Sequence, residues 1–156
     1  SHNTGEQPWT AGAALHSYFA IGDVGRLRIE GLAGCDYIDK LDGNQRKQQV
    51  GDLGISEAVD RIYFHQQETD DAENVCVIHD EAGARQIVVT SSGSRSTVVS
   101  PPWSDNAKAM GDFPDAGYQH MVCVEAANAA DDVRQLAPGE SHRLCQRIAL
   151  SKGKVA

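Results

Sequence analysis

The chain has 156 residues, of which 40% are hydrophobic, and its formal net charge is −8 at pH 7. This length and apolar content allow one compact domain, so we treat residues 1–156 as a single all-β unit. The negative charge, with no run of Lys or Arg, argues against a nucleic-acid partner. No apolar run approaches the roughly 20 residues of a membrane-spanning helix, so we expect no membrane association.

Short apolar or alternating segments recur along the chain and are separated by turn residues such as Asp42-Gly43-Asn44 and Pro138-Gly139. This spacing is typical of an antiparallel β-sandwich rather than of βαβ units. At most one short helix is expected, around Asp105–Met110. The expected strands are Ala11–Ile21, Arg26–Gly31, Arg61–Gln66, Val75–Asp80, Arg85–Ser91, Ser96–Ser100, His120–Ala126 and Ser141–Leu150. In the last of these, Leu144, Gln146, Ile148 and Leu150 form a largely apolar face.

The four cysteines are widely spaced and lack a CxxC pair. Three of them lie in apolar, strand-like segments, which is typical of free, buried thiols in a reducing compartment. We therefore expect a cytoplasmic protein. Zinc ligation would need clustered Cys and His residues, which the sequence lacks, so no metal site is predicted.

His16 lies in the apolar segment Ala13–Ala20, where it is either a satisfied core residue or lines a pocket. Position alone favours the core residue. Imidazole is nevertheless suited to proton transfer, because its unperturbed pKa is about 6.5.

Glu125 ends the apolar segment Met121-Val-Cys-Val-Glu and is expected to be buried or half-buried. Burying an ionised carboxylate is costly unless it is paired, and desolvation raises its pKa. Glu125 is therefore either a functional carboxylate or the structural partner of an Arg, and the sequence does not decide between them.

Three further residues are candidates for substrate binding. Asp60 lies where a loop enters a strand, and could bind sugar hydroxyls, although a capping role or a pair with Arg61 is favoured locally. Asp60 and Glu125 could also be the carboxylate pair of a glycoside hydrolase. Trp103 could stack on a sugar ring or anchor its loop. Arg61 could contact a phosphate or remain a solvated surface charge.

Eight collinear segments give the chain a resemblance to a known family. In order, they are Asn3-Thr-Gly-Glu-Gln-Pro, Ala14-Leu-His-Ser-Tyr-Phe-Ala-Ile-Gly-Asp-Val, Gly31-Leu32 with Tyr37-Ile-Asp-Lys, Asp60-Arg-Ile-Tyr, Pro102-Trp with Lys108-Ala-Met, Asp112-Phe with Tyr118, Met121-Val-Cys-Val-Glu, and Leu136-Ala-Pro-Gly-Glu. Together they resemble the hexose-6-phosphate mutarotase (glucose-6-phosphate 1-epimerase) branch of the galactose-mutarotase-like, or aldose 1-epimerase, family.

The resemblance implies a part of a β-supersandwich, with this chain as the C-terminal half of a longer mutarotase domain. An N-terminal half or a second copy of the chain would then complete the sandwich. It implies an aldose 1-epimerase that interconverts the anomers of a hexose or hexose 6-phosphate, with no cofactor. His16 would be the general acid, Glu125 the general base and Asp60 a sugar ligand. The alternative is a non-catalytic carbohydrate-binding β-sandwich.

Overall fold

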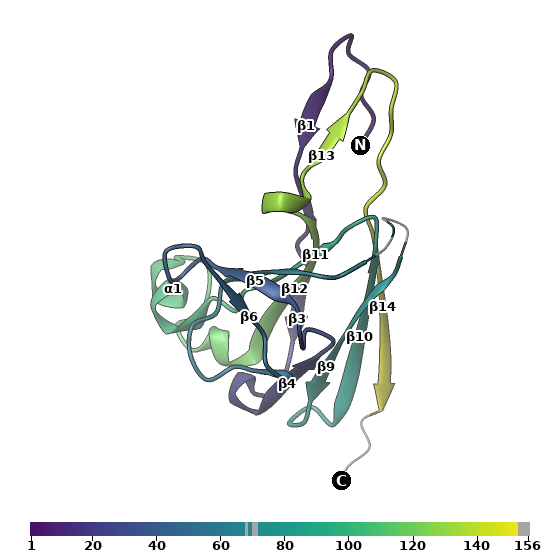
Figure 1. Cartoon of the computed structure of the whole chain (residues 1–156). Coiled ribbons are helices and arrows are strands. Elements are labelled where there is room, and N and C mark those ends of the chain that lie inside the picture. The colour runs from purple at the N-terminus through teal and green to yellow at the C-terminus, as the bar shows by residue number, and fades with distance from the viewer. Residues whose placement is uncertain (68, 70–71, 153–156) are drawn as a thin grey trace.

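Two antiparallel β-sheets face each other, and a two-stranded ribbon extends from one end of them (Figure 1). We describe this fold from a computed structural model, which covers residues 1–67, 69 and 72–152. The ribbon pairs two strands, β1 (Trp9–Ala11) and β13 (Arg134–Leu136). The prediction of an all-β sandwich is confirmed.

The larger sheet has seven strands and carries the site described below. Two short strands share one side of β12, and the remaining strands follow on its other side. In spatial order these are β2 (Ala13–Leu15) and β3 (Tyr18–Ala20), β12 (Met121–Asn128), β11 (Ser96–Val99), β8 (Arg61–Phe64), β5 (Asp36–Asp39) and β6 (Gln45–Gln48).

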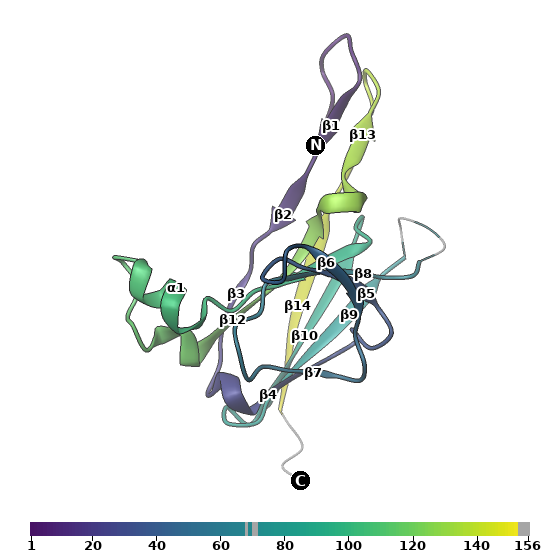
Figure 2. The same cartoon turned by 60° about the vertical axis from the view of Figure 1, so that its left-hand side comes forward.

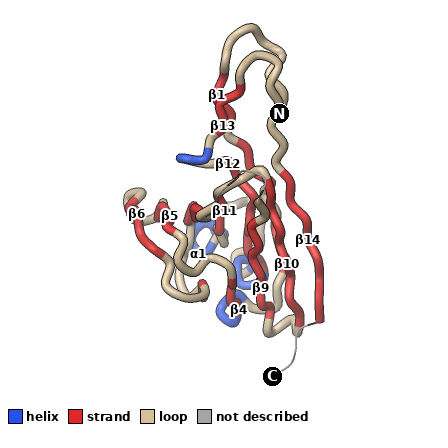
Figure 3. The backbone as a smooth tube through the Cα atoms, turned by 45° about the vertical axis from the view of Figure 1, so that its right-hand side comes forward, coloured by secondary structure: helices blue, strands red, loops and turns tan. Residues whose placement is uncertain are grey.

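The smaller sheet has five strands, and its three longest lie side by side in Figure 3. In spatial order the strands are β14 (Cys145–Lys152), β10 (Arg85–Ser92), β9 (Asn74–Asp80), β4 (Leu27–Glu30) and β7 (Leu53–Gly54).

One α-helix, α1 (Trp103–Ala109), lies beside β3 and β12 (Figure 2) and fits the expected short helix around Asp105–Met110. Single 3₁₀ turns are η1 (Val24–Arg26), η2 (Gly117–His120) and η3 (Ala130–Asp132). In the part of the chain that the structure describes, no helix has the length and apolar content to cross a bilayer.

The hydrophobic core lies between the two sheets. Val122 and Val124 of β12 and Tyr63 of β8 enter it from the larger sheet, and Ile29 and Ile78 enter it from the smaller one. All five are completely buried. Because side chains alternate along a strand, the odd-numbered residues of β12 point to the opposite face of the larger sheet.

Several strand predictions need correction. The expected strand Ala11–Ile21 is divided among β1, β2 and β3, because Gly12 and the pair His16–Ser17 interrupt its hydrogen bonding. The hairpin of β5 and β6 was not predicted, since β6 is exposed and all-polar and gives no hydrophobic signal. The last strand begins at Cys145 rather than Ser141.

The predicted apolar face of β14 is not buried. Ile148 and Leu150 pair with the buried Val89 and Ile87 of β10, yet they are 50% and 67% exposed. The strand forms an edge of its sheet, so pairing on one side leaves its side chains open. The free state of all four cysteines is confirmed, although Cys145, on this strand, is only half-buried.

Gly31→Ala is expected to destabilise the fold by about 2–4 kcal/mol, from a left-handed backbone cost plus overpacking. Gly31 has φ +100°, and an added Cβ would lie 2.1 Å from the carbonyl oxygen of Val75. Gly34→Ala is the matched control, because Gly34 has φ +80° but open space around it, so we expect a loss of only about 1 kcal/mol. Urea unfolding of both variants measures the difference, and equal losses would contradict the steric explanation.

Candidate active site

His16 and Glu125 come together because their strands pair. The register of β12 with β2 and β3 is continuous, with Leu15 opposite Ala126 and Tyr18 opposite Cys123. Carried across the break between β2 and β3, this register places His16 opposite Glu125. His16 Nε2 lies 3.4 Å from Glu125 Oε1. The pair is on the sheet face opposite the core.

The break between β2 and β3 shapes the histidine side of this pair. The Ser17 amide donates to the Leu15 carbonyl at 2.9 Å, which turns the backbone at His16. The imidazole stacks on Tyr18, with ring centroids 4.6 Å apart and planes 10° from parallel. The His16 side chain is 51% exposed, whereas that of Glu125 is 5% exposed. The pair therefore joins a solvent-open imidazole to a buried carboxyl.

The environment of Glu125 favours its protonated form. Burial raises the pKa of this carboxyl above its ordinary value, and the neighbouring Asp60 adds to the rise, while His16 and Lys40 oppose it. A raised pKa brings the carboxyl closer to the neutral range, where an acid–base catalyst must both release and accept a proton.

Asp60 and Lys40 extend the site along the same sheet face. Lys40 Nζ donates to Asp60 Oδ2 at 2.6 Å. Within the described residues, Asp60 Oδ1 is buried and has no hydrogen-bond partner. A sugar hydroxyl could satisfy such an oxygen, and leaving it unsatisfied costs stability. The sequence predicted Asp60 as a candidate but not Lys40, whose only signal was its place in the segment Tyr37-Ile-Asp-Lys.

The structure does not bring Arg61 to this group. Arg61 points to the opposite face of β8 from Asp60, where its guanidinium lies 4.7 Å from the centroid of the Tyr37 ring. It also donates to Tyr63 at 3.5 Å and lies 3.9 Å from Asp39. Its contacts are therefore interior ones, and a phosphate contact has no support from this position.

The contacts of Trp103 are with the core and with Tyr118. It begins α1 with φ +54°, packs partly buried against the core, and tilts against Tyr118 with ring centroids 5.3 Å apart. These contacts are those of a loop anchor, which was the alternative to sugar stacking.

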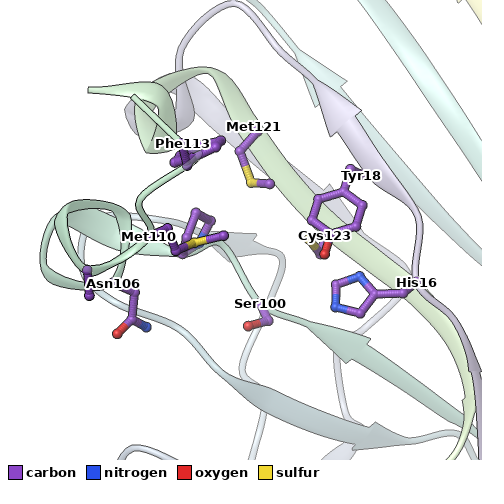
Figure 4. A pocket seen from close by; sticks show the side chains of 10 residues that line it. His16, Tyr18, Ser100, Asn106, Met110, Phe113, Met121 and Cys123 are labelled. Atoms are coloured by element: carbon purple, nitrogen blue, oxygen red, sulfur yellow. The ribbon is translucent and has the colours of Figure 1, made fainter. Parts of the chain in front are cut away.

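A pocket of about 470 Å³ opens beside the pair, between the sheet and α1 (Figure 4). In Figure 4, His16, Tyr18 and Cys123 line one side, and Asn106 and Met110 face them from the other. Glu125 does not itself line the pocket but contacts His16, which does. Ser100, Pro102, Ala109, Phe113 and Met121 complete the lining. This arrangement places an acid–base pair at the edge of a small-molecule site. The sequence did not predict that residues of α1 and the loop after it line a pocket, because these residues meet the sheet only in the folded structure.

Glu125→Gln is expected to raise the thermal stability of the protein at pH 8. Because the pKa of Glu125 is raised on folding, the folded state loses stability as the pH rises above the ordinary pKa of Glu, and the loss is complete above the raised pKa. Gln has nearly the same shape and no charge, so a gain on the order of 1 kcal/mol is expected. The gain should vanish as the pH falls to about 4.3, the usual pKa of Glu. Thermal unfolding across this range measures it, and a gain independent of pH would contradict the assignment.

Comparisons of the sequence with a family model and with curated proteins point to the same family. A family model described as aldose 1-epimerase matches residues 1–149. A Cenchrus ciliaris protein is 39% identical over 150 residues, which are 96% of this chain and 43% of that protein. An Escherichia coli K12 protein is 35% identical over 143 residues, 90% of this chain and 45% of that protein. Both bear the name "putative glucose-6-phosphate 1-epimerase".

A solved structure agrees with these sequence matches. The crystal structure of a Salmonella typhimurium protein described as a "putative mutarotase" superposes with a TM-score of 0.81 at 30% identity. The match covers 94% of this chain and 47% of that one. The chain thus spans about half the length of the relatives it matches.

Proposed function

Because the chain belongs to the aldose 1-epimerase family, we propose that His16 and Glu125 interconvert the α and β anomers of a hexose 6-phosphate. The observation that carries the proposal is the 3.4 Å contact between an open imidazole and a buried carboxyl beside a pocket. Asp60, with one unpartnered carboxylate oxygen, would hold a sugar hydroxyl.

The reaction needs one proton removed from the C1 hydroxyl oxygen and one delivered to the ring oxygen. Glu125, as a carboxylate, takes the proton of the C1 hydroxyl, and His16, as an imidazolium, protonates the ring oxygen. The bond between C1 and the ring oxygen breaks and leaves the open-chain aldehyde. Both oxygens are bonded to C1, so a base and an acid only a few ångströms apart can serve them together.

Ring closure restores the two catalytic groups. After rotation about C1–C2, the hydroxyl formed from the ring oxygen attacks the other face of the aldehyde and gives its proton to His16. Glu125 returns its proton to the former aldehyde oxygen, which becomes the C1 hydroxyl again. Each group therefore acts once as acid and once as base, which requires proton affinities matched near neutral pH. The raised pKa of Glu125 favours such a match.

The 6-phosphate of the proposed substrate is supported by the names of the relatives. Since those relatives are about twice as long, the activity is proposed for the whole protein. Four free cysteines support a cytoplasmic location for it.

Exchange NMR of the C1 protons of glucose 6-phosphate and of glucose tests this function on the full-length protein. We expect the protein to accelerate α–β exchange, and to do so more with the phosphorylated sugar. Equal acceleration of both sugars would remove the phosphate from the proposal. If the protein binds sugar saturably but does not accelerate exchange, the proposed enzyme function is wrong and the non-catalytic carbohydrate-binding β-sandwich is favoured.

A further inference from the structure

Three side chains of different chemistry converge beside the pocket. Cys123 and Glu125 are alternate residues on one face of β12, and His16 lies opposite Glu125 across the strand pair. The thiol sulfur, a carboxylate oxygen and an imidazole nitrogen of these residues all lie within 4.8 Å of one another. Proton transfer uses His16 and Glu125 but leaves Cys123 without a role.

This donor set suits a cation of borderline softness. Zinc accepts sulfur, nitrogen and carboxylate oxygen at about 2.0–2.3 Å, and tetrahedral ligands then lie roughly 3.5 Å apart. Donors that lie within 4.8 Å of one another would have to approach by at most about 1.3 Å, which small rotations of the three side chains can supply. Three protein ligands also leave a fourth position open. Hard cations such as Mg²⁺ avoid thiolate and imidazole ligands.

The surroundings allow such an ion to enter and leave. His16 and Cys123 both line the pocket, so a cation can reach them from solvent. Asp60 adds negative charge on the same sheet face, and Lys40, which donates to it, offsets part of that charge. A metal must displace the proton of the Cys123 thiol, so we expect binding to strengthen as the pH rises.

From these contacts we propose that His16, Cys123 and Glu125 form a binding site for a borderline-soft divalent cation of the Zn²⁺ class, and that the bound cation inhibits the enzyme. Coordination occupies the imidazole lone pair and the carboxylate, so neither can transfer a proton, and the ion lies where the sugar would enter. Metal binding stands by itself, whereas inhibition rests on the proposed function. Sequence spacing predicted no metal site because the donors come from paired strands.

Titration of the full-length protein with Co²⁺ tests the binding. We expect one equivalent of Co²⁺ to give the visible absorption bands of a low-coordinate site and a near-ultraviolet absorption from cobalt bound to thiolate. Added Zn²⁺ should displace the Co²⁺ and remove both signals. Cys123→Ser and Cys123→Ala should remove the near-ultraviolet absorption. His16→Ala should weaken binding by at least about 10–100-fold, the loss known for an outer-shell change. Circular dichroism confirms that each variant is folded.

Cys145→Ser is the matched control. Cys145 is more exposed than Cys123 and, among the residues that the structure describes, belongs to no cluster of three such donors. We expect this variant to keep the complete cobalt spectrum. The absence of a thiolate absorption in the parent protein, or its survival in both Cys123 variants, would overturn the metal site.

Exchange NMR with and without Zn²⁺ tests the inhibition separately. At zinc concentrations that displace cobalt, the catalysed exchange should fall in proportion to site occupancy, and added sugar should relieve the loss. Unchanged exchange at full occupancy would overturn the inhibition. A protein that binds cobalt through Cys123 but never accelerates exchange would keep the metal site and remove the proposed function.

Discussion

Glu125→Gln is expected to lower the catalysed rate of anomer exchange by about 10²–10⁴-fold, the usual contribution of a positioned acid–base group. Gln keeps the shape of the side chain, so the substitution leaves no cavity in the buried site. The Gln side chain, however, cannot take the proton of the C1 hydroxyl. Exchange NMR at saturating glucose 6-phosphate measures the loss. We expect sugar affinity to change much less, because the group acts mainly in the transition state.

Glu81→Gln is the control for this substitution. Glu81 forms a surface pair with Arg26 at 3.9 Å, and both side chains are more than half exposed. Such a pair contributes little, so neither stability nor exchange should change. If Glu125→Gln retained the parent rate in a folded protein, Glu125 would not be the base.

His16→Ala should also reduce the catalysed exchange by about 10²–10⁴-fold, because nothing would then protonate the ring oxygen. The imidazole is 51% exposed and lines the pocket, so its removal leaves a space open to solvent. Added imidazole should therefore enter and restore part of the rate. This rescue distinguishes lost proton transfer from a damaged fold.

His79→Ala is the matched control for the histidine. His79 lies in the other sheet, where it contacts Glu30 at 2.8 Å, and it should leave the exchange rate unchanged. A parent-like rate for His16→Ala would contradict the role of His16, and a loss that imidazole does not restore would favour a structural role.

Much of the site follows from the sequence. The apolar segments around His16 and Glu125 predicted strands, and the resemblance predicted their roles. The structure adds a continuous register that makes the two residues neighbours. Register depends on which strands pair, and local sequence does not specify that. The burial of Glu125 was predicted because apolar residues precede it on both faces of β12.

Other features could not be obtained in this way. Lys40 reaches Asp60 only because β5 pairs with β8, so no local pattern reveals the contact. The opposite orientation of Asp60 and Arg61 could have been inferred, since adjacent strand residues face opposite sides. The position of Trp103 depends on its packing against Tyr118, which is a tertiary contact.

The most direct test of the pair is the exchange rate of the double variant His16→Ala, Glu125→Gln beside the two single variants. Acid and base act in the same step, so removing the second group after the first should cost little more. We predict a double variant about as slow as the slower single variant. Losses that multiply would show two independent contributions and contradict a His16–Glu125 pair that works as one unit.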